Sequence, residues 1–159
     1  MIYRQITKAD DEVLAKIIRT NLKAHSLDIP GTVYFDKNLD HLSDYYLDNG
    51  EKRFYYILTD ESENIIGGVG LAEFSAFDSC AELQKLYLID SAKGQGLGYK
   101  LIELIEGKAR ALAYKRIYLE THDNLSIAIH LYKKCGYIEI EKPQEVVHST
   151  MTRFFLKDL

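Results

Sequence analysis

The sequence predicts an α/β fold, in which a central mixed β-sheet is flanked by about four helices within a single domain spanning residues 1–159. Two patterns carry this prediction. Runs rich in aromatic and β-branched residues follow one another between residues 53 and 89, which is typical of an antiparallel meander. Beyond residue 96 the pattern alternates between helix and strand, which is typical of parallel pairing between strands.

The first elements are a strand and an amphipathic helix. Residues 1–6 alternate loosely and predict a strand. Thr7 then offers an N-cap hydroxyl, and Asp10 places a carboxylate near the positive end of the helix dipole. The buried stripe of this helix is expected from residues at helical spacing: Val13, Leu14, Ile17, Ile18 and Leu22.

A second helix is expected over residues 37–48, after Pro30-Gly31 interrupts the chain. Aspartates recur every four residues along this segment, as Asp36, Asp40, Asp44 and Asp48. A solvated helix face explains this acidic stripe, and attraction of a cationic ligand is the alternative.

The remaining elements are predicted from helical spacing of apolar residues and from short runs rich in aromatic and β-branched residues. Strands are expected over residues 53–59, 65–74, 81–89, 116–121, 136–140 and 151–157. Helices are expected over residues 97–114 and 126–135, the latter with Gly136 at its end.

The charge balance argues against two classes of partner. The chain has 20 Lys and Arg against 24 Asp and Glu, a formal net charge of −4 at pH 7. Without a basic field, neither nucleic acid nor an anionic membrane is an expected partner. No apolar run approaches the roughly 20 residues that span a bilayer, and no signal peptide begins the chain, so a cytoplasmic location is expected.

Cysteine and histidine usage predicts neither a disulfide framework nor a metal site. Cys80 and Cys135 are far apart and belong to no CxxC, so both are expected to be reduced. The histidines show no HExxH or other ligand spacing, so no metal is expected.

The most informative segment runs from residue 86 to residue 99. A strand ends there, three alternate glycines follow at positions 94, 96 and 98, and an amphipathic helix begins at once. Glycine lets the backbone pass close to a ligand, and the free N–H groups of a first helical turn suit a pyrophosphate. The segment does not fit Walker A, because no GxxxxGK followed by Ser or Thr occurs. It does not fit the dinucleotide fingerprint GxGxxG either, because Tyr99 and Leu101 stand where the third glycine is needed in the two possible registers. A glycine-rich turn without a ligand is the alternative.

This segment resembles the coenzyme A signature of the GNAT N-acetyltransferase superfamily. That signature is an Arg or Gln, two residues, a Gly, one residue, and a Gly or Ala. Lys93, Gly96 and Gly98 occupy these places. Lys93 departs from the usual Arg or Gln, and it keeps a cation near the phosphates without the guanidinium fork.

A second block resembles the later motif of the same superfamily. The family pattern is a strand, an Asn, a helix bearing Leu-Tyr, and a Gly followed by an aromatic residue. Residues 119–137 reproduce it, with Asn124, Leu131-Tyr132 and Gly136-Tyr137 in that order. The two blocks together identify the chain as similar to a small, single-domain GNAT member over nearly its whole length.

The resemblance implies acetyl-CoA as the acyl donor and coenzyme A as the product. In such enzymes the strand before the signature splays from its neighbour, and its backbone, here Leu86, Tyr87 and Leu88, holds the pantetheine arm. A backbone N–H of Tyr87 or Leu88 would polarise the thioester carbonyl. The pyrophosphate would rest on amides of the signature loop, which comprises Lys93, Gly94, Gln95, Gly96, Leu97, Gly98 and Tyr99. Asn124 matches a residue that meets the pantetheine arm, and an N-cap role is its alternative.

The resemblance also implies an acyltransferase of class EC 2.3.1.-. A primary amine of an unidentified small-molecule or peptide acceptor would attack the thioester directly in a ternary complex. Tyr132 matches the tyrosine that protonates the leaving sulfur, and a core aromatic role is its alternative. For the base, Glu120 leads, Glu82 competes and Glu73 is third, although the base often acts through water in this fold.

Other interpretations remain open at this point. A non-catalytic acyl-CoA-binding sensor or interaction module would keep the glycine loop but would need neither Tyr132 nor a base. A nucleotide-binding protein with an atypical loop is a weaker rival, because both fingerprints fail. Dimers are frequent in the superfamily, and the final strand offers an edge for a homodimer.

Overall fold

The computed structural model describes residues 1–144, 146 and 148–159. Its strands are β1 (Ile2–Gln5), β2 (Phe54–Thr59), β3 (Ile65–Glu73), β4 (Cys80–Leu88), β5 (Arg116–Thr121), β6 (Ile138–Ile140) and β7 (Arg153–Asp158). Its α-helices are α1 (Asp11–Ala24), α2 (Leu42–Asp48), α3 (Leu97–Ala111) and α4 (Ser126–Lys134). Short 3₁₀ turns are η1 (Lys8–Asp10), η2 (Val33–Phe35), η3 (Leu39–His41) and η4 (Asp90–Ala92).

These strands form one seven-stranded sheet within the described part of the chain. The strand order is β1-β2-β3-β4-β5-β7-β6. Neighbours are antiparallel except β4 and β5, which are parallel. The prediction of a mixed sheet with flanking helices is confirmed.

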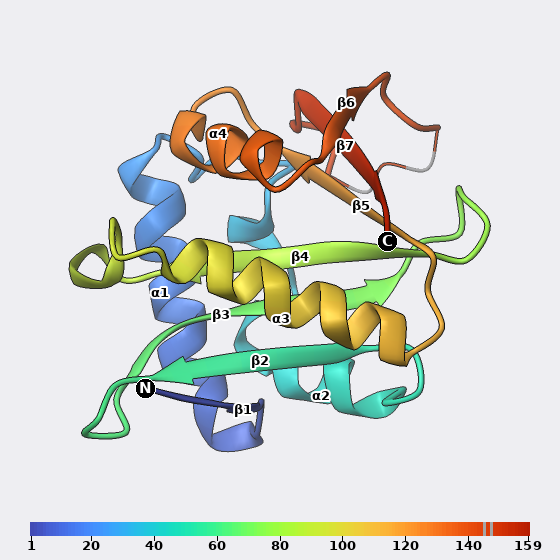
Figure 1. Cartoon of the computed structure of the whole chain (residues 1–159). Helices are drawn as coiled ribbons and strands as arrows, with labels where there is room; N and C mark the ends of the chain where they lie inside the picture. Colours follow the sequence, from blue (N-terminus) through green and yellow to red (C-terminus); the bar gives the residue numbers. More distant parts are fainter. Residues whose placement is uncertain (145, 147) are drawn as a thin grey trace.

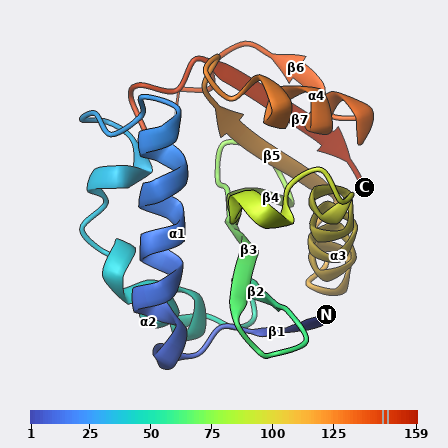
Figure 2. The ribbon, with the colours of Figure 1, turned by 90° about the vertical axis from the view of Figure 1, so that its left-hand side faces the viewer.

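The helices cover both faces of this sheet. Figure 2 shows α1 and α2 on one face and α3 and α4 on the other. The apolar stripe of α1 buries Leu14, Ile18 and Leu22 in one core, and α3 buries its own stripe in the second core. Val13 does not belong to the buried stripe as predicted, because its side chain is 45% exposed.

The parallel pair β4–β5 separates after a short stretch. Its ladder joins Cys80 with Arg116, Ala81 with Ile117 and Glu82 with Tyr118, and it ends there. Both strands continue beyond this point, and Figure 1 shows β5 running away from β4 at an angle. The splay expected from the family resemblance is therefore present, and it leaves the second half of β4 without a strand on that side.

A bulge shapes β4 at the point where the splay begins. Gly68 pairs with Tyr87 but Gly70 pairs with Gln84, so β4 has one extra residue opposite β3. Lys85 lies in this bulge with φ at 49°, a left-handed conformation that costs energy in a residue with a side chain. The Tyr55 hydroxyl donates a hydrogen bond of 2.8 Å to the Lys85 carbonyl, which holds the bulge from behind.

Glycines in β3 make room for buried tyrosines. A Cβ at Gly70 would lie 2.5 Å from the Tyr46 hydroxyl and 2.7 Å from the Tyr55 ring. These two tyrosines are fully buried, and their rings contact each other at a tilt of 54° with 5.0 Å between the centroids. The glycine therefore serves packing here.

The second helix is shorter than predicted. The structure has η3 and then α2 from Leu42, whereas a helix over residues 37–48 was expected. His41 has φ −140° and ψ 41°, which interrupts the helical hydrogen-bonding path before Leu42. The four aspartates of the acidic stripe consequently do not share one helix face.

Two helix ends also differ from the predictions. Thr7 is the N-cap of η1, whereas the N-cap of α1 is Asp10. The Thr7 backbone N–H and hydroxyl donate to the Asp10 carboxylate at 2.7 and 2.9 Å. Helix α3 ends at Ala111 and not at residue 114, because Ala113 is left-handed with φ at 64°. The hydrogen bonds of a helix continue only as far as the backbone dihedral angles remain helical.

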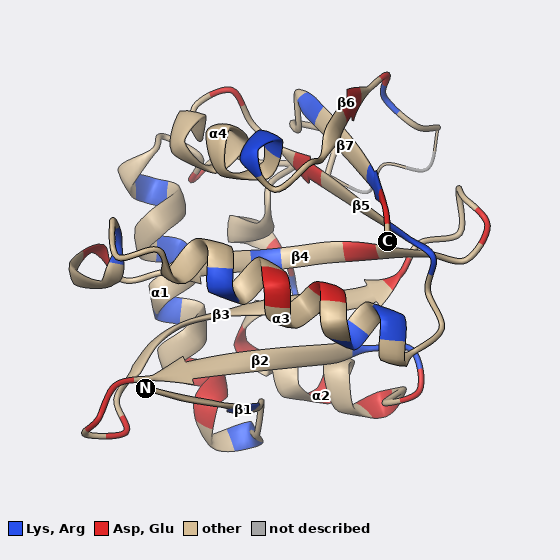
Figure 3. Cartoon of the chain, in the orientation of Figure 1, with Lys and Arg blue, Asp and Glu red and all other residues tan. Residues whose placement is uncertain are grey.

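Charges of both signs are spread over the surface elements. Figure 3 shows Lys and Arg interspersed with Asp and Glu along α3, and acidic residues in the β2–β3 turn. Among the described residues, no helix is long and apolar enough to span a membrane.

We predict that Gly70→Ala destabilises the protein by about 1–3 kcal/mol, because the added methyl group overlaps two buried tyrosine rings. Urea unfolding followed by circular dichroism measures the change. Gly107→Ala is the matched control, since an exposed helical Cβ at Gly107 meets nothing within 4 Å. The control should match the wild type or gain up to about 1 kcal/mol. Equal stability of Gly70→Ala and wild type would contradict the packing argument.

Candidate active site

A cavity of about 440 Å³ lies beside the splayed part of β4. Its walls come from α1, β4, the loop before α3, β5 and α4. Gln95 and Glu73 do not line this cavity, whereas the other candidate residues from the sequence do: Glu82, Leu86, Tyr87, Leu88, Lys93, Gly94, Gly96, Leu97, Gly98, Tyr99, Glu120, Asn124 and Tyr132. The fold thus brings the two motif blocks to one site.

The glycine loop forms one end of the cavity. Gly94 and Gly96 both have φ at 76°, and a Cβ at either would meet no atom within 4 Å. The backbone conformation therefore requires glycine, and the space beside it is open. Gly96 is the N-cap of α3, so the N–H groups of the first turn from Leu97 have no partner within the helix.

Gly98 has a different role in the same loop. A Cβ at this position would lie 2.8 Å from Cδ2 of Leu131 in α4. The missing side chain therefore lets α4 pack closely against the first turn of α3. Gly94 and Gly96 thus leave the backbone of the loop exposed to the cavity, whereas Gly98 allows the close contact between α3 and α4.

Glu82 lies at the other end of the cavity, where β4 and β5 are still paired. The Gln84 side-chain amide donates a hydrogen bond of 2.6 Å to its carboxylate, and the Tyr46 hydroxyl donates to Oε1 of Gln84 at 2.8 Å. Tyr46 therefore fixes the orientation of the amide that faces Glu82. Burial raises the pKa of Glu82 to about 7, and nearby Glu120 adds to this increase.

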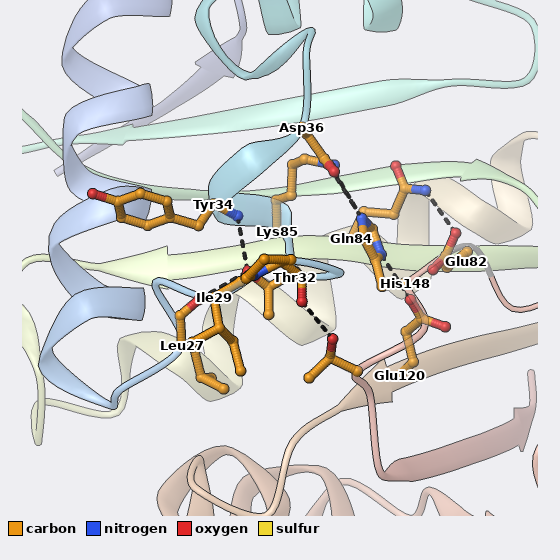
Figure 4. A network of polar contacts seen from close by, with 12 residues as sticks. Leu27, Ile29, Thr32, Tyr34, Asp36, Glu82, Gln84, Lys85, Glu120 and His148 are labelled. Carbon is orange, nitrogen blue, oxygen red and sulfur yellow. Dashed lines mark hydrogen bonds and ion pairs between the residues drawn. The ribbon is translucent and has the colours of Figure 1, made fainter.

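Glu120 lies close to Glu82, but its carboxylate also contacts the imidazole of His148. Its Oε1 lies 2.8 Å from Nδ1 of His148, and the Tyr118 hydroxyl donates to its Oε2 at 3.2 Å. The other ring nitrogen of His148 lies 3.0 Å from Oδ1 of Asp36. Figure 4 shows His148 between these two carboxylates, which come from opposite sides of the site.

His148 titrates far from its ordinary range. Burial works against the charged imidazole, but the hydrogen bonds with Asp36 and Glu120 outweigh it and raise its pKa to about 9. The Asp36 carboxylate is itself partly buried, yet His148 and Lys85 hold its pKa below the usual value. Nζ of Lys85 lies 3.6 Å from Oδ2 of Asp36.

Tyr132 projects from α4 and lines the cavity. Its ring packs between Tyr137 and Phe155, at centroid distances of 6.0 and 6.3 Å. Burial raises the pKa of its hydroxyl, so the group stays protonated at neutral pH and is available as a donor. Tyr132 therefore both packs in the core and lines the cavity.

Comparisons with known proteins agree with this architecture. The model of the acetyltransferase (GNAT) family matches residues 20–137. The chain is 34% identical over 142 residues to YjgM, an uncharacterized N-acetyltransferase of Escherichia coli K12, covering 88% of this chain and 83% of the relative. The chain belongs to the GNAT acetyltransferase family. The predicted class of acyltransferases, EC 2.3.1.-, is confirmed by this membership.

Solved GNAT structures share the whole fold. A GNAT acetyltransferase from Staphylococcus aureus Mu50 superposes with a TM-score of 0.86 at 19% identity, covering 99% of this chain and 98% of that one. Spermidine N-acetyltransferase from Vibrio cholerae, solved in complex with CoA and spermine, gives a TM-score of 0.73 at 19% identity, with 99% and 94% covered.

Two residues of the GNAT signature have partners within the chain. Nζ of Lys93 lies 2.6 Å from the exposed Asp90 carboxylate, so the only cation of the signature is paired in this structure. The Gln95 amide donates to the Ser91 carbonyl at 2.7 Å and stabilises the loop from outside the cavity. Both residues therefore support the loop's shape.

Asn124 is not the N-cap of α4, because that position belongs to Leu125. Its side-chain amide donates to the His25 carbonyl at 2.9 Å and ties the β5–α4 loop to the end of α1. Asn21 makes a second tie, donating to the Leu88 carbonyl at 3.0 Å. Asn21 was not singled out from the sequence, although a buried amide on the apolar stripe of a helix was the available signal.

Some sequence candidates lie elsewhere. Glu73 forms a two-point ion pair with Arg53 at 2.6 and 2.8 Å and does not line the cavity. In the acidic stripe, Asp40 pairs with Arg19, and Asp36 pairs with His148 and Lys85. The solvated-face interpretation is thus replaced, for these two aspartates, by pairing within the chain.

His148 was considered in the sequence only as a metal ligand. No group of three or more His, Cys, Asp or Glu that could hold a metal ion occurs among the residues the structure describes. No spacing rule links position 148 with Asp36 or Glu120, because the contact exists only after the sheet has formed. His148 is therefore a residue that sequence reasoning missed.

The raised pKa of His148 predicts a pH-dependent contribution to stability. The stabilisation is complete below the unfolded pKa near 6.5 and is lost as pH rises through about 9. We expect the stability difference between wild type and His148→Gln to shrink by about 3 kcal/mol between pH 6 and pH 10. Urea unfolding of both proteins at each pH measures this, and titrations of groups distant from His148 cancel in the difference. A constant difference would contradict it.

Proposed function

We propose that this chain transfers an acetyl group from acetyl-CoA to a primary amine by direct attack within a ternary complex. The observation that carries the proposal is the single cavity that joins the glycine loop and the start of α3 with Tyr132 and Glu82. One end offers unpaired backbone donors for phosphates, and the other end offers groups that accept and donate protons.

The donor end fits coenzyme A on two observations. The open space beside Gly94 and Gly96 admits phosphates close to the backbone, and the first turn of α3 directs N–H groups there. Lys93 would add a cation by releasing Asp90. When bound, acetyl-CoA supplies the activated acyl group. The backbone of Leu86, Tyr87 and Leu88 would hold the pantetheine arm, and an N–H of Tyr87 or Leu88 would face the thioester oxygen.

The polar end of the cavity contains two candidate general bases, Glu82 and Glu120. An alkylammonium with a pKa near 10 must lose a proton before its nitrogen can form the new C–N bond. Of the two candidate bases, Glu82 has only a neutral donor, whereas Glu120 is held by His148. A carboxyl with a pKa of about 7 takes up a proton readily at neutral pH, so these contacts favour Glu82.

Tyr132 completes the proton balance. As the C–S bond breaks, the leaving sulfur requires a proton, and the buried hydroxyl of Tyr132 lines the cavity and is protonated. Asn124 would meet the pantetheine arm through its remaining amide oxygen, because its nitrogen already donates to His25. The acceptor is a primary amine of a small molecule or peptide, and polyamines belong in the test because a GNAT neighbour was solved with spermine.

We expect purified protein to release free thiol from acetyl-CoA with at least one member of a panel of monoamines, polyamines, amino acids and peptides. Tyr132→Phe should lower kcat by roughly 10²–10⁴-fold while the affinity for CoA changes little, because only the leaving group loses its proton donor. Stopped-time thiol assays and calorimetry with CoA supply the two readouts.

Tyr137→Phe is the matched control, since Tyr137 is a neighbouring buried tyrosine that does not line the cavity. It should keep nearly full kcat. CoA binding without turnover on any amine would instead favour the acyl-CoA-binding sensor, in which Tyr132→Phe changes nothing.

A further inference from the structure

The polar end of the cavity contains an unusual concentration of charge. Three carboxylates, Asp36, Glu82 and Glu120, gather there with two cationic groups, Lys85 and His148. Lys85 has a 10% exposed side chain and His148 a 17% exposed one, so solvent screens these charges only weakly.

The geometry of His148 requires a particular protonation state. Its Nδ1 lies 2.8 Å from a Glu120 oxygen, and its Nε2 lies 3.0 Å from an Asp36 oxygen. An ionised carboxylate only accepts hydrogen bonds, and a neutral imidazole has only one N–H. Both contacts are satisfied together only when both ring nitrogens carry protons, that is, when His148 is an imidazolium.

Glu120 and Glu82 therefore differ in the hydrogen-bond donors that compensate their negative charge. Glu120 receives a charged donor from His148 and a hydroxyl from Tyr118. Glu82 receives a single neutral amide from Gln84. Two neighbouring carboxylates cannot both ionise easily in a buried site, so the one with the cation ionises first and the other keeps the exchangeable proton.

We propose that His148 is a positioning residue that holds Glu120 ionised, and thereby makes Glu82 the carboxyl that exchanges a proton in the cavity. The catalytic meaning of this division rests on the proposed acetyltransferase function, whereas the division itself is a property of the free protein. His148 acts through Glu120 and need not touch either substrate.

The groups that face His148 set the direction of the effect. Within the described residues these are Asp36 beside η2, Glu82 and Lys85 of β4, and Glu120 of β5. The imidazolium charge lowers the pKa of Glu82, because His148 attracts its carboxylate form. A neutral side chain at position 148 should remove the preference for an ionised Glu120 over an ionised Glu82, because His148 contacts Glu120 directly and acts on Glu82 only through space.

The test is a titration of side-chain carboxyl signals by NMR in protein labelled with ¹³C-glutamate, with Glu82→Gln and Glu120→Gln identifying the two signals. The proposal predicts a higher midpoint for Glu82 than for Glu120 in the wild type. In His148→Gln this gap between the two midpoints should shrink by about one pH unit, and in His148→Arg, which restores a cation, it should return toward the wild-type value. His41→Gln, at an exposed histidine, is the matched control and should leave the gap unchanged.

Amide spectra establish that each variant is folded, and His148→Asn serves as a second neutral variant if His148→Gln is not. A gap between the Glu82 and Glu120 midpoints that stays within 0.2 units of wild type in a folded neutral variant, on the order of experimental error, would overturn the proposal. So would a widening of that gap.

Enzyme kinetics provide the functional arm. The acidic limb of the kcat/KM profile should shift in His148→Gln and return toward its wild-type position in His148→Arg. Wild-type protein without turnover on any amine would refute the proposed function and would leave the NMR titration to decide the role of His148. An unmoved limb in an active His148→Gln enzyme would refute the positioning role alone.

Discussion

The separation of β4 from β5 is the constraint on which the rest of the site depends. The two parallel strands pair only as far as Glu82 and Tyr118 and then diverge. A strand without a partner on one side has backbone groups free to bind something else, and a continuous sheet would leave no room for the cavity. The glycine loop and α3 follow directly from the end of this free segment, so the phosphate-type end of the site is fixed by the same divergence.

The divergence is supported from behind. Tyr55 holds the Lys85 carbonyl in the bulge, and Tyr46 orients Gln84 toward Glu82. Both rings need the space left by Gly70 in β3. Tyr46 of α2 and Tyr55 of β2 thus support the strand that forms one wall of the cavity. The net charge of −4 does not oppose anion binding, because the donors at the start of α3 are backbone N–H groups rather than side chains.

Much of the fold and part of the site could be predicted from the sequence. The strand runs and the helix of residues 97–111 have local periodicity, and the two motif blocks place Tyr132, Glu82 and Glu120 at one cavity. Contacts set by tertiary structure could not be predicted. The pairing of His148 with Asp36 joins residues 112 positions apart, and the break before α2 depends on the dihedrals of His41. The local sequence predicts neither the contact between His148 and Asp36 nor the break before α2.

The most direct test of the account measures hydrogen exchange of backbone amides with and without coenzyme A. We expect added coenzyme A to slow exchange in the segments of residues 83–88 and 94–100, because the free edge of β4 and the start of α3 would then have partners. Residues 56–59 of β2, paired on both sides, should be unaffected. Unchanged exchange in both expected segments, at a coenzyme A concentration that saturates binding, would contradict the claim that the gap between β4 and β5 is the acyl-donor site.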